Sequence, residues 1–369
     1  MHSNRGLDRG YVLTSYIILM VGFILSACSY GEKEQEPTIL QNNPSQAGQL
    51  SRSSPDDQGM DPEKLEDMVV EMKSSGLEHH SVIIIRNGSI ILEEHFENDD
   101  FGPAEPHPIC SGTKSIVSIL IGIAVDEGHI KGVEQAVLEL FPGRDIKNLD
   151  PDKKSIKLKD LLSMSSGLRC RDSYVYDYQD MDNFSDSFDR VQYVLDLPME
   201  HIPGKEMNYC NGVSHLLSAI ITKQTGMSTS VYAYEKLFKP LGIKNVVWGI
   251  DARGINLGYT DVYLKPLDMA KIGVLYLNNG IWGEKQILSS DWVAESTIPQ
   301  SHSDHEDRGY GYQWWVEEEH YYYASGAGGQ FIFVVPQHNL VVVFTNELYG
   351  DDFWIPEMIL NKFIIPALN

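Results

Sequence analysis

The sequence is poor in basic residues for its length. It holds 29 Lys and Arg against 52 Asp and Glu, which gives a formal net charge of −23 and an isoelectric point near 4.8. Nucleic acids and anionic membrane surfaces repel such a protein, which argues against both as charged partners. The composition, 42% hydrophobic and 22% charged, is otherwise that of a globular protein, and no internal repeat divides the 369 residues.

Cysteine is also scarce, and the spacings typical of metal sites are missing. Among the four cysteines there is no Cys-x-x-Cys pair and no Cys/His spacing that favours zinc. His302-Ser303-Asp304-His305 holds metal-capable side chains, but no distant ligand accompanies them. The glycines at 326–329 are not followed by the Gly-Lys-Ser/Thr of a phosphate loop. We therefore predict a protein without a metal or cofactor.

No apolar run reaches the roughly 20 residues of a comfortable membrane span. The run Tyr11–Leu25 follows Arg5 and Arg9 and has the length of a signal-peptide core. It ends in Leu25-Ser26-Ala27-Cys28, which resembles the lipobox of bacterial lipoproteins. This resemblance implies a signal peptide over 1–27 and a lipid on Cys28, so we expect an exported, membrane-anchored protein. The alternative is an ordinary cleaved signal with an incidental cysteine.

The rest of the chain predicts an α+β domain over 56–369, after a flexible polar tether over 28–55. Asn87-Gly88 between two apolar runs is a strong hairpin signal. Strand patterns return only near the C-terminal end, so one antiparallel sheet is expected to combine both ends of the domain, flanked by helices. A mainly helical insertion occupies about 131–250. The expected helices are 62–76, about 111–127, 213–225, 267–279 and 354–368, and the expected strands are 81–86, 89–96, 310–316, 320–324, 330–335 and 340–345.

Ser111 and Lys114 form the Ser-x-x-Lys pattern at the start of a helix that is apolar on every side. Residues three apart share one face of a helix, so the hydroxyl and the amine would lie together. This is the arrangement of a nucleophile beside its base. The alternative is a helix N-cap serine followed by a solvated lysine.

A second pattern, Tyr209-Cys210-Asn211, follows about a hundred residues later and precedes a helix. A phenol beside an ammonium has a lowered pKa, so Tyr209 is a candidate to take or relay the Ser111 proton. The Asn211 amide is a candidate to hold a substrate carbonyl. Cys110 and Cys210 flank these residues and are expected to be packing residues. The pairing of Cys110, Cys170 and Cys210 stays open.

A third pattern, Ala324-Ser325-Gly326-Ala327-Gly328-Gly329-Gln330, occupies the place of a cleft-lining strand. With these three patterns the chain resembles the serine β-lactamase-related, penicillin-recognising hydrolases. Its motifs are closest to the branch of class C β-lactamases, esterases and 6-aminohexanoate-dimer hydrolases. The resemblance spans about 56–369 and includes four further stretches in order: 160–167, 203–209, 268–273 and 326–330.

The resemblance implies the β-lactamase/transpeptidase-like fold and a role for each matched residue. Ser111 would form the acyl-enzyme, and Lys114 and Tyr209 would transfer its proton. Asn211 would contact the substrate. The N–H groups of Ser111 and Ala327 would form the oxyanion hole, since paired donors stabilise the charge that develops there. Around Ala327, the residues Ser325, Gly326 and Gly328 would bind substrate.

The third motif differs from that of the class C β-lactamases, and this difference limits the expected class of substrate. Class C β-lactamases carry Lys-Thr-Gly in the third motif, whereas this chain has Ala324-Ser325-Gly326. The resemblance therefore favours an amide or ester substrate over an antibiotic. The alternatives are a D,D-peptidase or β-lactamase that acts on peptidoglycan-like substrates, and a catalytically silent binding protein on the same fold.

Three polar or aromatic stretches fall outside these motifs. The acidic segment 172–189 lacks the spacing of a calcium loop and is expected to be a solvated loop near the cleft. His79 and His80 are expected to face solvent before a strand. About half of the aromatic residues in 310–323 are expected in the core, with the rest along the cleft.

Overall fold

The computed structural model describes residues 50–96, 102, 105–170, 183–303, 307–317 and 320–369. The expected signal peptide, Cys28 and most of the acidic segment lie outside these residues. The described chain enters the sheet at strand β1, Ser51–Arg52, about five residues before the expected start of the domain. No helix in the described ranges is long and apolar enough to cross a membrane.

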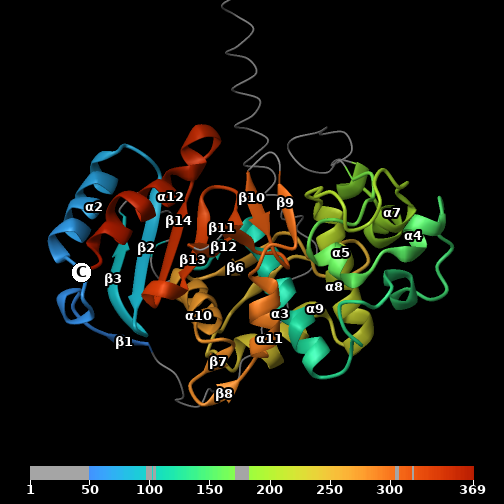
Figure 1. The fold of residues 1–369 in the computed structure, drawn as a ribbon, viewed down its shortest axis with the longest axis horizontal. Coiled ribbons are helices and arrows are strands. Elements are labelled where there is room, and N and C mark those ends of the chain that lie inside the picture. The colour runs from blue at the N-terminus through green and yellow to red at the C-terminus, as the bar shows by residue number, and fades with distance from the viewer. Residues whose placement is uncertain (1–49, 97–101, 103–104, 171–182, 304–306, 318–319) are drawn as a thin grey trace, which may run out of the picture. The chain divides into compact units, whose positions relative to one another are not determined.

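A nine-stranded sheet is the centre of the fold (Figure 1). Its spatial order is β1-β3-β2-β14-β13-β12-β11-β10-β9, and every neighbouring pair is antiparallel except β1 with β3. The strands after β1 are β2 (His79–Arg86), β3 (Ser89–His95), β9 (Ser301–Ser303), β10 (Arg308–Tyr310), β11 (Trp315–Glu317), β12 (Tyr321–Gly326), β13 (Gln330–Val335) and β14 (Leu340–Asn346). As predicted, both ends of the domain contribute to this sheet.

The hairpin of β2 and β3 shows how local sequence positions the N-terminal strands. Asn87 and Gly88 both have positive φ, at 49° and 76°, which is the backbone of the two-residue turn that matches strand twist. The next step is long-range. Strand β2 pairs with β14 from Arg86↔Leu340 to Asn346↔His79, so the hairpin joins strands from the far end of the chain.

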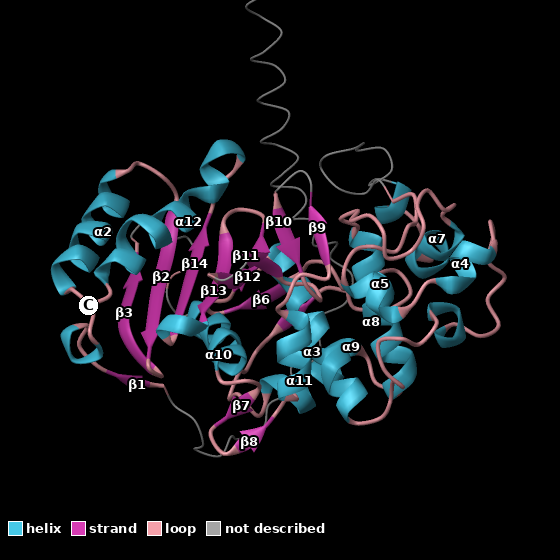
Figure 2. Cartoon of the chain, viewed as in Figure 1, coloured by secondary structure: helices cyan, strands magenta, loops and turns pink. Residues whose placement is uncertain are grey.

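Helices cover both faces of the sheet, and the central strands are therefore buried on both sides. One face packs against α3 (Thr113–Asp126) and α10 (Pro266–Leu277), as Figure 2 shows. The other face packs against α2 (Pro62–Ser74) and the C-terminal α12 (Ile355–Ile359) with its continuation to Ala367. Strands β13 and β14 read as continuous apolar runs because neither face meets solvent.

The predicted helical region is present between α3 and α10. It contains α4 (Pro151–Ser155), α5 (Leu158–Leu162), α7 (Arg190–Asp196), α8 (Asn211–Thr225) and α9 (Thr229–Ala233). A small sheet follows it, formed by β4 (His107–Pro108), β5 (Val247–Trp248) and β6 (Val262–Leu264). The remaining elements are β7 (Ile281–Trp282), β8 (Lys285–Gln286) and α11 (Ser290–Ser296).

Three sequence expectations are wrong in the sheet half. The expected strand 310–316 is two strands, β10 and β11, because Gln313 at φ 62° turns the chain between them. His79 and His80 do not face solvent: they lie within β2 and are only 2% and 6% exposed. The aromatic residues of 310–323 are nearly all buried, and Trp315 is the partly exposed member.

Candidate active site

Ser111 lies in a 3₁₀ turn, Cys110–Gly112, immediately before α3. Its neighbours Cys110 and Gly112 are buried, whereas Ser111 is half-buried, so its hydroxyl is accessible. The N-cap of α3 is Gly112, and no side chain caps the helix. The alternative reading of Ser111 as a helix cap is therefore wrong.

Lys114 is the buried group next to Ser111. Its side chain is on the first turn of α3, and the residue is 1% exposed. The Nζ atom lies 3.0 Å from Ser111 Oγ, 2.8 Å from Asn211 Oδ1 and 3.3 Å from the Tyr259 carbonyl oxygen. The alternative of a solvated lysine is therefore wrong.

These three contacts define what Lys114 can do. The Asn211 and Tyr259 oxygens can only accept hydrogen bonds, so each requires an N–H of the lysine. Ser111 Oγ can either donate or accept. The Nζ atom donates to both oxygens, and its 3.0 Å contact with Ser111 Oγ is the one along which a proton could pass. The geometry thus suits Lys114 to accept the Ser111 proton.

Tyr209 reaches the same lysine from the other side. Lys114 Nζ lies 4.7 Å from the centroid of the Tyr209 ring. Trp315 stacks on that ring at 6.0 Å, and Tyr310 meets it edge-on at 6.2 Å. The structure therefore brings Ser111, Lys114, Tyr209 and Asn211 together, as the sequence predicted.

The segment that carries Tyr209 is clamped to the segment before residue 171. A disulfide joins Cys170 to Cys210, and Cys110 is disulfide-bonded as well, so the expectation that Cys110 and Cys210 are only packing residues is wrong. The Asn208 Nδ2 group also donates to the carbonyls of Leu168 and Cys170, at 3.3 and 3.0 Å. The clamp holds both residues that flank Tyr209.

The third motif forms the end of β12 and the turn after it. Gly326 lies so close to the start of the nucleophile turn that a Cβ there would be 2.1 Å from the Ile109 carbonyl oxygen. Only glycine fits at such a close approach. Ser325 and Ala327, on either side of Gly326, are half-buried. Strand β12 therefore carries Ala327 beside the turn that holds Ser111.

The turn after Ala327 is fixed by side-chain amides. Gly328 and Gly329 have φ of 80° and 76°, a conformation that favours glycine. The Gln330 Nε2 group donates to the Gly328 and Asn346 carbonyls, and Asn346 Nδ2 donates to the Gly329 carbonyl. This network stabilises the backbone around the predicted oxyanion donor.

Sequence reasoning missed Tyr259, whose carbonyl is the third partner of Lys114. Every residue has a backbone carbonyl, so no sequence motif could have indicated that this one accepts a hydrogen bond from Lys114. The Tyr259 ring also lies 5.9 Å from Lys114 Nζ, and Arg190 Nη1 lies 3.4 Å from its hydroxyl. Nearby, burial raises the pKa of Asp261 to about 6, although the positive Arg190 acts in the opposite direction.

The described residues contain no cluster of three or more His, Cys, Asp or Glu side chains that could hold a metal ion. The stretch 302–305, where the sequence predicted no metal site, lies partly outside the described residues. The side chains that meet at the candidate site supply a hydroxyl, an amine, a phenol and an amide.

Three known proteins show what this chain is similar to. A 6-aminohexanoate-dimer hydrolase of Paenarthrobacter ureafaciens is 23% identical over 70% of each chain. A Salmonella typhimurium protein provisionally named a D-alanyl-D-alanine carboxypeptidase is 23% identical over 64% of this chain and 60% of its own. A structure provisionally identified as a 6-aminohexanoate-dimer hydrolase from Bacillus anthracis superposes with a TM-score of 0.70. It is 19% identical and covers 97% of this chain and 94% of its own.

A family model settles the wider relationship. The model described as Beta-lactamase matches residues 69–356, which span most of the sheet and the whole helical region. The chain therefore belongs to the β-lactamase family, a family of hydrolases within the serine β-lactamase-related superfamily.

Proposed function

We propose that this protein is a serine hydrolase that cleaves an amide or ester through an acyl-enzyme on Ser111. The observation that carries the proposal is the 3.0 Å contact between Lys114 Nζ and Ser111 Oγ, with the Asn211 and Tyr259 carbonyl oxygens also within hydrogen-bond distance of Nζ. A buried amine held in this way is a base beside a nucleophile.

In the proposed reaction, Lys114 accepts the Ser111 proton while Oγ bonds to the substrate carbonyl carbon. The carbonyl electrons move to its oxygen, and the N–H groups of Ser111 and Ala327 donate to that oxygen. The intermediate then collapses, and the amine or alcohol leaves with the proton, which Lys114 and Tyr209 deliver. Water subsequently attacks the acyl carbon with the same groups acting in reverse.

The third motif supports an amide or ester without a required carboxylate. Ala324 stands on β12 at the place where class C β-lactamases carry the lysine of Lys-Thr-Gly, so this position offers no cation. The 6-aminohexanoate-dimer hydrolase relative, which is named for an amide, supports the same substrate class.

The test combines a mechanism probe with a substrate panel. Ser111→Ala should abolish labelling by a fluorophosphonate and turnover of short acyl esters. Ser115→Ala, on the same helix, removes only a hydrogen bond to the Gln313 carbonyl and should keep both activities. Labelling that survives in Ser111→Ala would refute the mechanism, and an unlabelled wild type would favour the silent binding protein.

The panel then separates the enzyme alternatives. Short acyl esters, N-acyl amides, D-amino-acid peptides and nitrocefin are assayed in parallel on wild type and Ser111→Ala. Faster Ser111-dependent cleavage of the D-amino-acid peptide would favour the D,D-peptidase, and turnover of nitrocefin would favour a β-lactamase.

We also propose that the protein is exported and anchored by a lipid on Cys28. The apolar run before Cys28 supports export. The Cys170–Cys210 disulfide supports it too, because such bonds persist mainly in oxidising compartments. Radiolabelled palmitate should appear on the wild type and not on Cys28→Ala; equal labelling of both would remove the anchor.

A further inference from the structure

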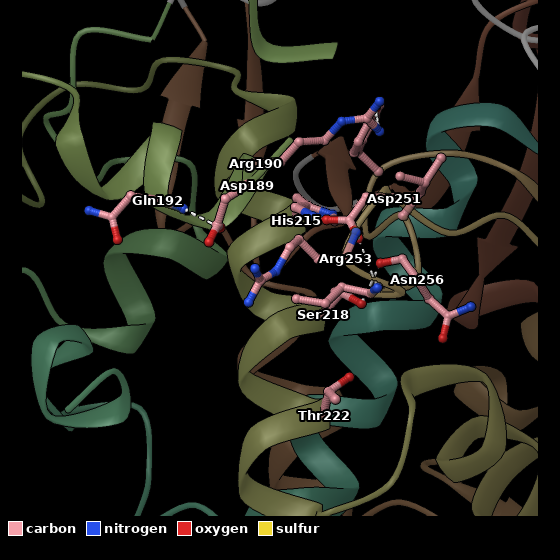
Figure 3. A network of polar contacts seen from close by, with 12 residues as sticks. Asp189, Arg190, Gln192, His215, Ser218, Thr222, Asp251, Arg253 and Asn256 are labelled. Carbon is pink, nitrogen blue, oxygen red and sulfur yellow. Dashed lines mark hydrogen bonds and ion pairs between the residues drawn. The ribbon is translucent and has the colours of Figure 1, made fainter. Parts of the chain in front are cut away.

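A buried His–Asp pair lies below the active site and takes no part in the proposed chemistry. His215 Nε2 and Asp251 Oδ2 are 3.0 Å apart, and both side chains are 0% exposed (Figure 3). His215 lies one turn of α8 after Asn211, so both residues face the same side of that helix. A fully buried polar pair is weak evidence of net stability, and a positioning role is the alternative.

The charge state of the pair follows from its surroundings. Burial lowers the pKa of His215, against the effect of Asp251, so the ring is neutral and donates its Nε2 hydrogen. Burial would raise the pKa of Asp251, but hydrogen bonds from His215 and from two backbone N–H groups hold it below its usual value. The pair is thus a neutral imidazole that donates to a carboxylate.

Asp251 lies in the first turn of the loop 249–261 and forms hydrogen bonds that fix the conformation of this turn. Its Oδ1 accepts the N–H groups of Arg253 and Ile255 at 2.8 and 2.9 Å, and its own N–H donates to the Ile255 carbonyl. Figure 3 shows Asp251 between this turn and His215. One carboxylate therefore fixes the loop internally and ties it to α8.

Further along, the same loop is packed directly against α8. A Cβ on Gly258 would lie 2.1 Å from the Ser214 carbonyl oxygen, so backbone meets backbone there. The Ser218 hydroxyl donates to the Asn256 carbonyl at 2.7 Å, one turn below His215. The loop has little freedom to move relative to the helix that carries Asn211.

The loop delivers Tyr259 to Lys114. The Tyr259 carbonyl accepts from Lys114 Nζ, and the Tyr259 ring meets the His215 ring edge-on at 6.2 Å. Phe184 contacts both rings, at 6.1 and 5.5 Å. His215 therefore touches Asp251 at one edge and the residue that binds the base at the other.

We propose that His215 and Asp251 are a positioning pair that fixes the Tyr259 carbonyl as an acceptor for Lys114 Nζ. Without the pair, the loop would shift on α8 and Lys114 would lose an acceptor that holds its Nζ beside Ser111. The inference rests on the proposed function, because it concerns the reactivity of Ser111.

The experiment measures Ser111 reactivity in four variants of the full-length protein. His215→Leu and Asp251→Leu each remove one partner, whereas His215→Gln places an amide N–H near the position of the imidazole Nε2 hydrogen. Lys153→Met is the matched control: it removes a second fully buried polar side chain, with bonds to the Lys147 and Leu195 carbonyls, away from the site.

The readouts are the second-order rate of fluorophosphonate labelling, kcat and KM for a small ester, and Tm. We expect His215→Leu and Asp251→Leu to lower the labelling rate and kcat about 10- to 100-fold, as misplaced catalytic groups do, with little change in KM. His215→Gln should recover most of that loss. Lys153→Met should lower Tm and leave the labelling rate within about twofold of wild type.

Each outcome decides between the two proposals. If wild type labels and His215→Leu labels equally fast, the positioning pair is wrong while the serine mechanism stands. The same conclusion follows if His215→Leu does not fold and a fifth variant, Asp251→Asn, which keeps the volume, labels at the rate of wild type but at a lower Tm. A wild type that never labels instead refutes the proposed function.

Discussion

The sheet half and the helical region of this protein are held together by different interactions. The central strands are joined by backbone hydrogen bonds, and their side chains are almost entirely apolar. The helical region instead buries polar and charged side chains, among them Lys153, Asp160, His215 and Asp251, and contains the Cys170–Cys210 disulfide. The sheet is a rigid apolar scaffold. The helical region contributes buried polar side chains, whose hydrogen bonds depend on their orientation.

The active site combines one contribution from each half. The sheet brings Gly326 and Ala327 to the nucleophile, through the close backbone approach at Ile109. The helical region brings Asn211 and Tyr259 to Lys114. Changes on the helical side should therefore disturb proton transfer, and changes on the sheet side should disturb the stabilisation of the oxyanion.

The largest effect is expected at Lys114, where the helical region meets the nucleophile. Lys114→Met keeps the apolar stem and removes the amine, so we expect kcat/KM to fall about a thousandfold, the usual loss of a general base. Steady-state hydrolysis of an acyl ester measures it, with Tm as the check on folding. Lys153→Met should keep its kcat/KM; an equal fall in both variants would show that losing any buried lysine suffices.

The disulfide should be the next strongest determinant, and it acts on stability. Its two cysteines are 40 residues apart, so replacing both by Ala should lower the free energy of unfolding by about 3–4 kcal/mol. Urea denaturation measures the loss. Hydrogen exchange should accelerate in α8 and stay slow in β13 and β14. Equal acceleration in both would mean that the two halves unfold as one unit.

On the sheet side, Gly326→Ala should lower kcat/KM about a hundredfold. The added methyl would lie 2.1 Å from the Ile109 carbonyl oxygen, so β12 must move and carry the Ala327 N–H away from the oxyanion. Gly112→Ala is the control, because its methyl meets only Ile109 side-chain atoms at 3.6 Å or more and its φ is −55°. Comparable kcat/KM in both variants would contradict the close-approach argument.

The smallest effect concerns pH and the buried Asp261. Its pKa is about 6 in the folded protein, against about 3.9 when unfolded, so between pH 4 and 6 only the folded form keeps the proton. Folding stability from this group is complete below about pH 4 and is lost as pH rises through 6; between about pH 4.5 and 7.5 the loss is about 2 kcal/mol.

Asp261→Asn should remove that part of the pH dependence. Urea denaturation at pH 4.5 and 7.5 compares the two proteins, and the variant should be relatively more stable than wild type at the higher pH. An identical pH difference in both would show that Asp261 titrates normally in the folded state.

Sequence patterns predicted the residues of the candidate site better than the surrounding contacts that hold these residues in place. Short motifs predicted that Ser111, Lys114, Tyr209 and Asn211 lie together, because the residue type at each motif position is visible in the sequence. The hairpin at Asn87-Gly88 and strand β13 were predicted closely, since turn chemistry and apolar runs are local signals.

The missed features depend on tertiary contacts. The Tyr259 carbonyl is a backbone group, and His215 meets Asp251 only after the loop folds over α8. The burial of His79 and His80 likewise depends on β14, which pairs with β2 from far along the chain. In each case the partner, and not the residue itself, determines the environment.

The pairing of β2 with β14 also determines how long one edge of β2 stays unpaired during synthesis. Arg86 and Leu340 are partners across about 250 residues, so β2 has no neighbour on that side until almost the whole chain has been synthesised. At 5–20 residues per second, the interval is roughly 10–50 s. During it, the apolar segment Ser81-Val-Ile-Ile-Ile85 is an unpaired strand edge that other chains can join. The nascent chain is therefore most prone to aggregate before β14 has been synthesised.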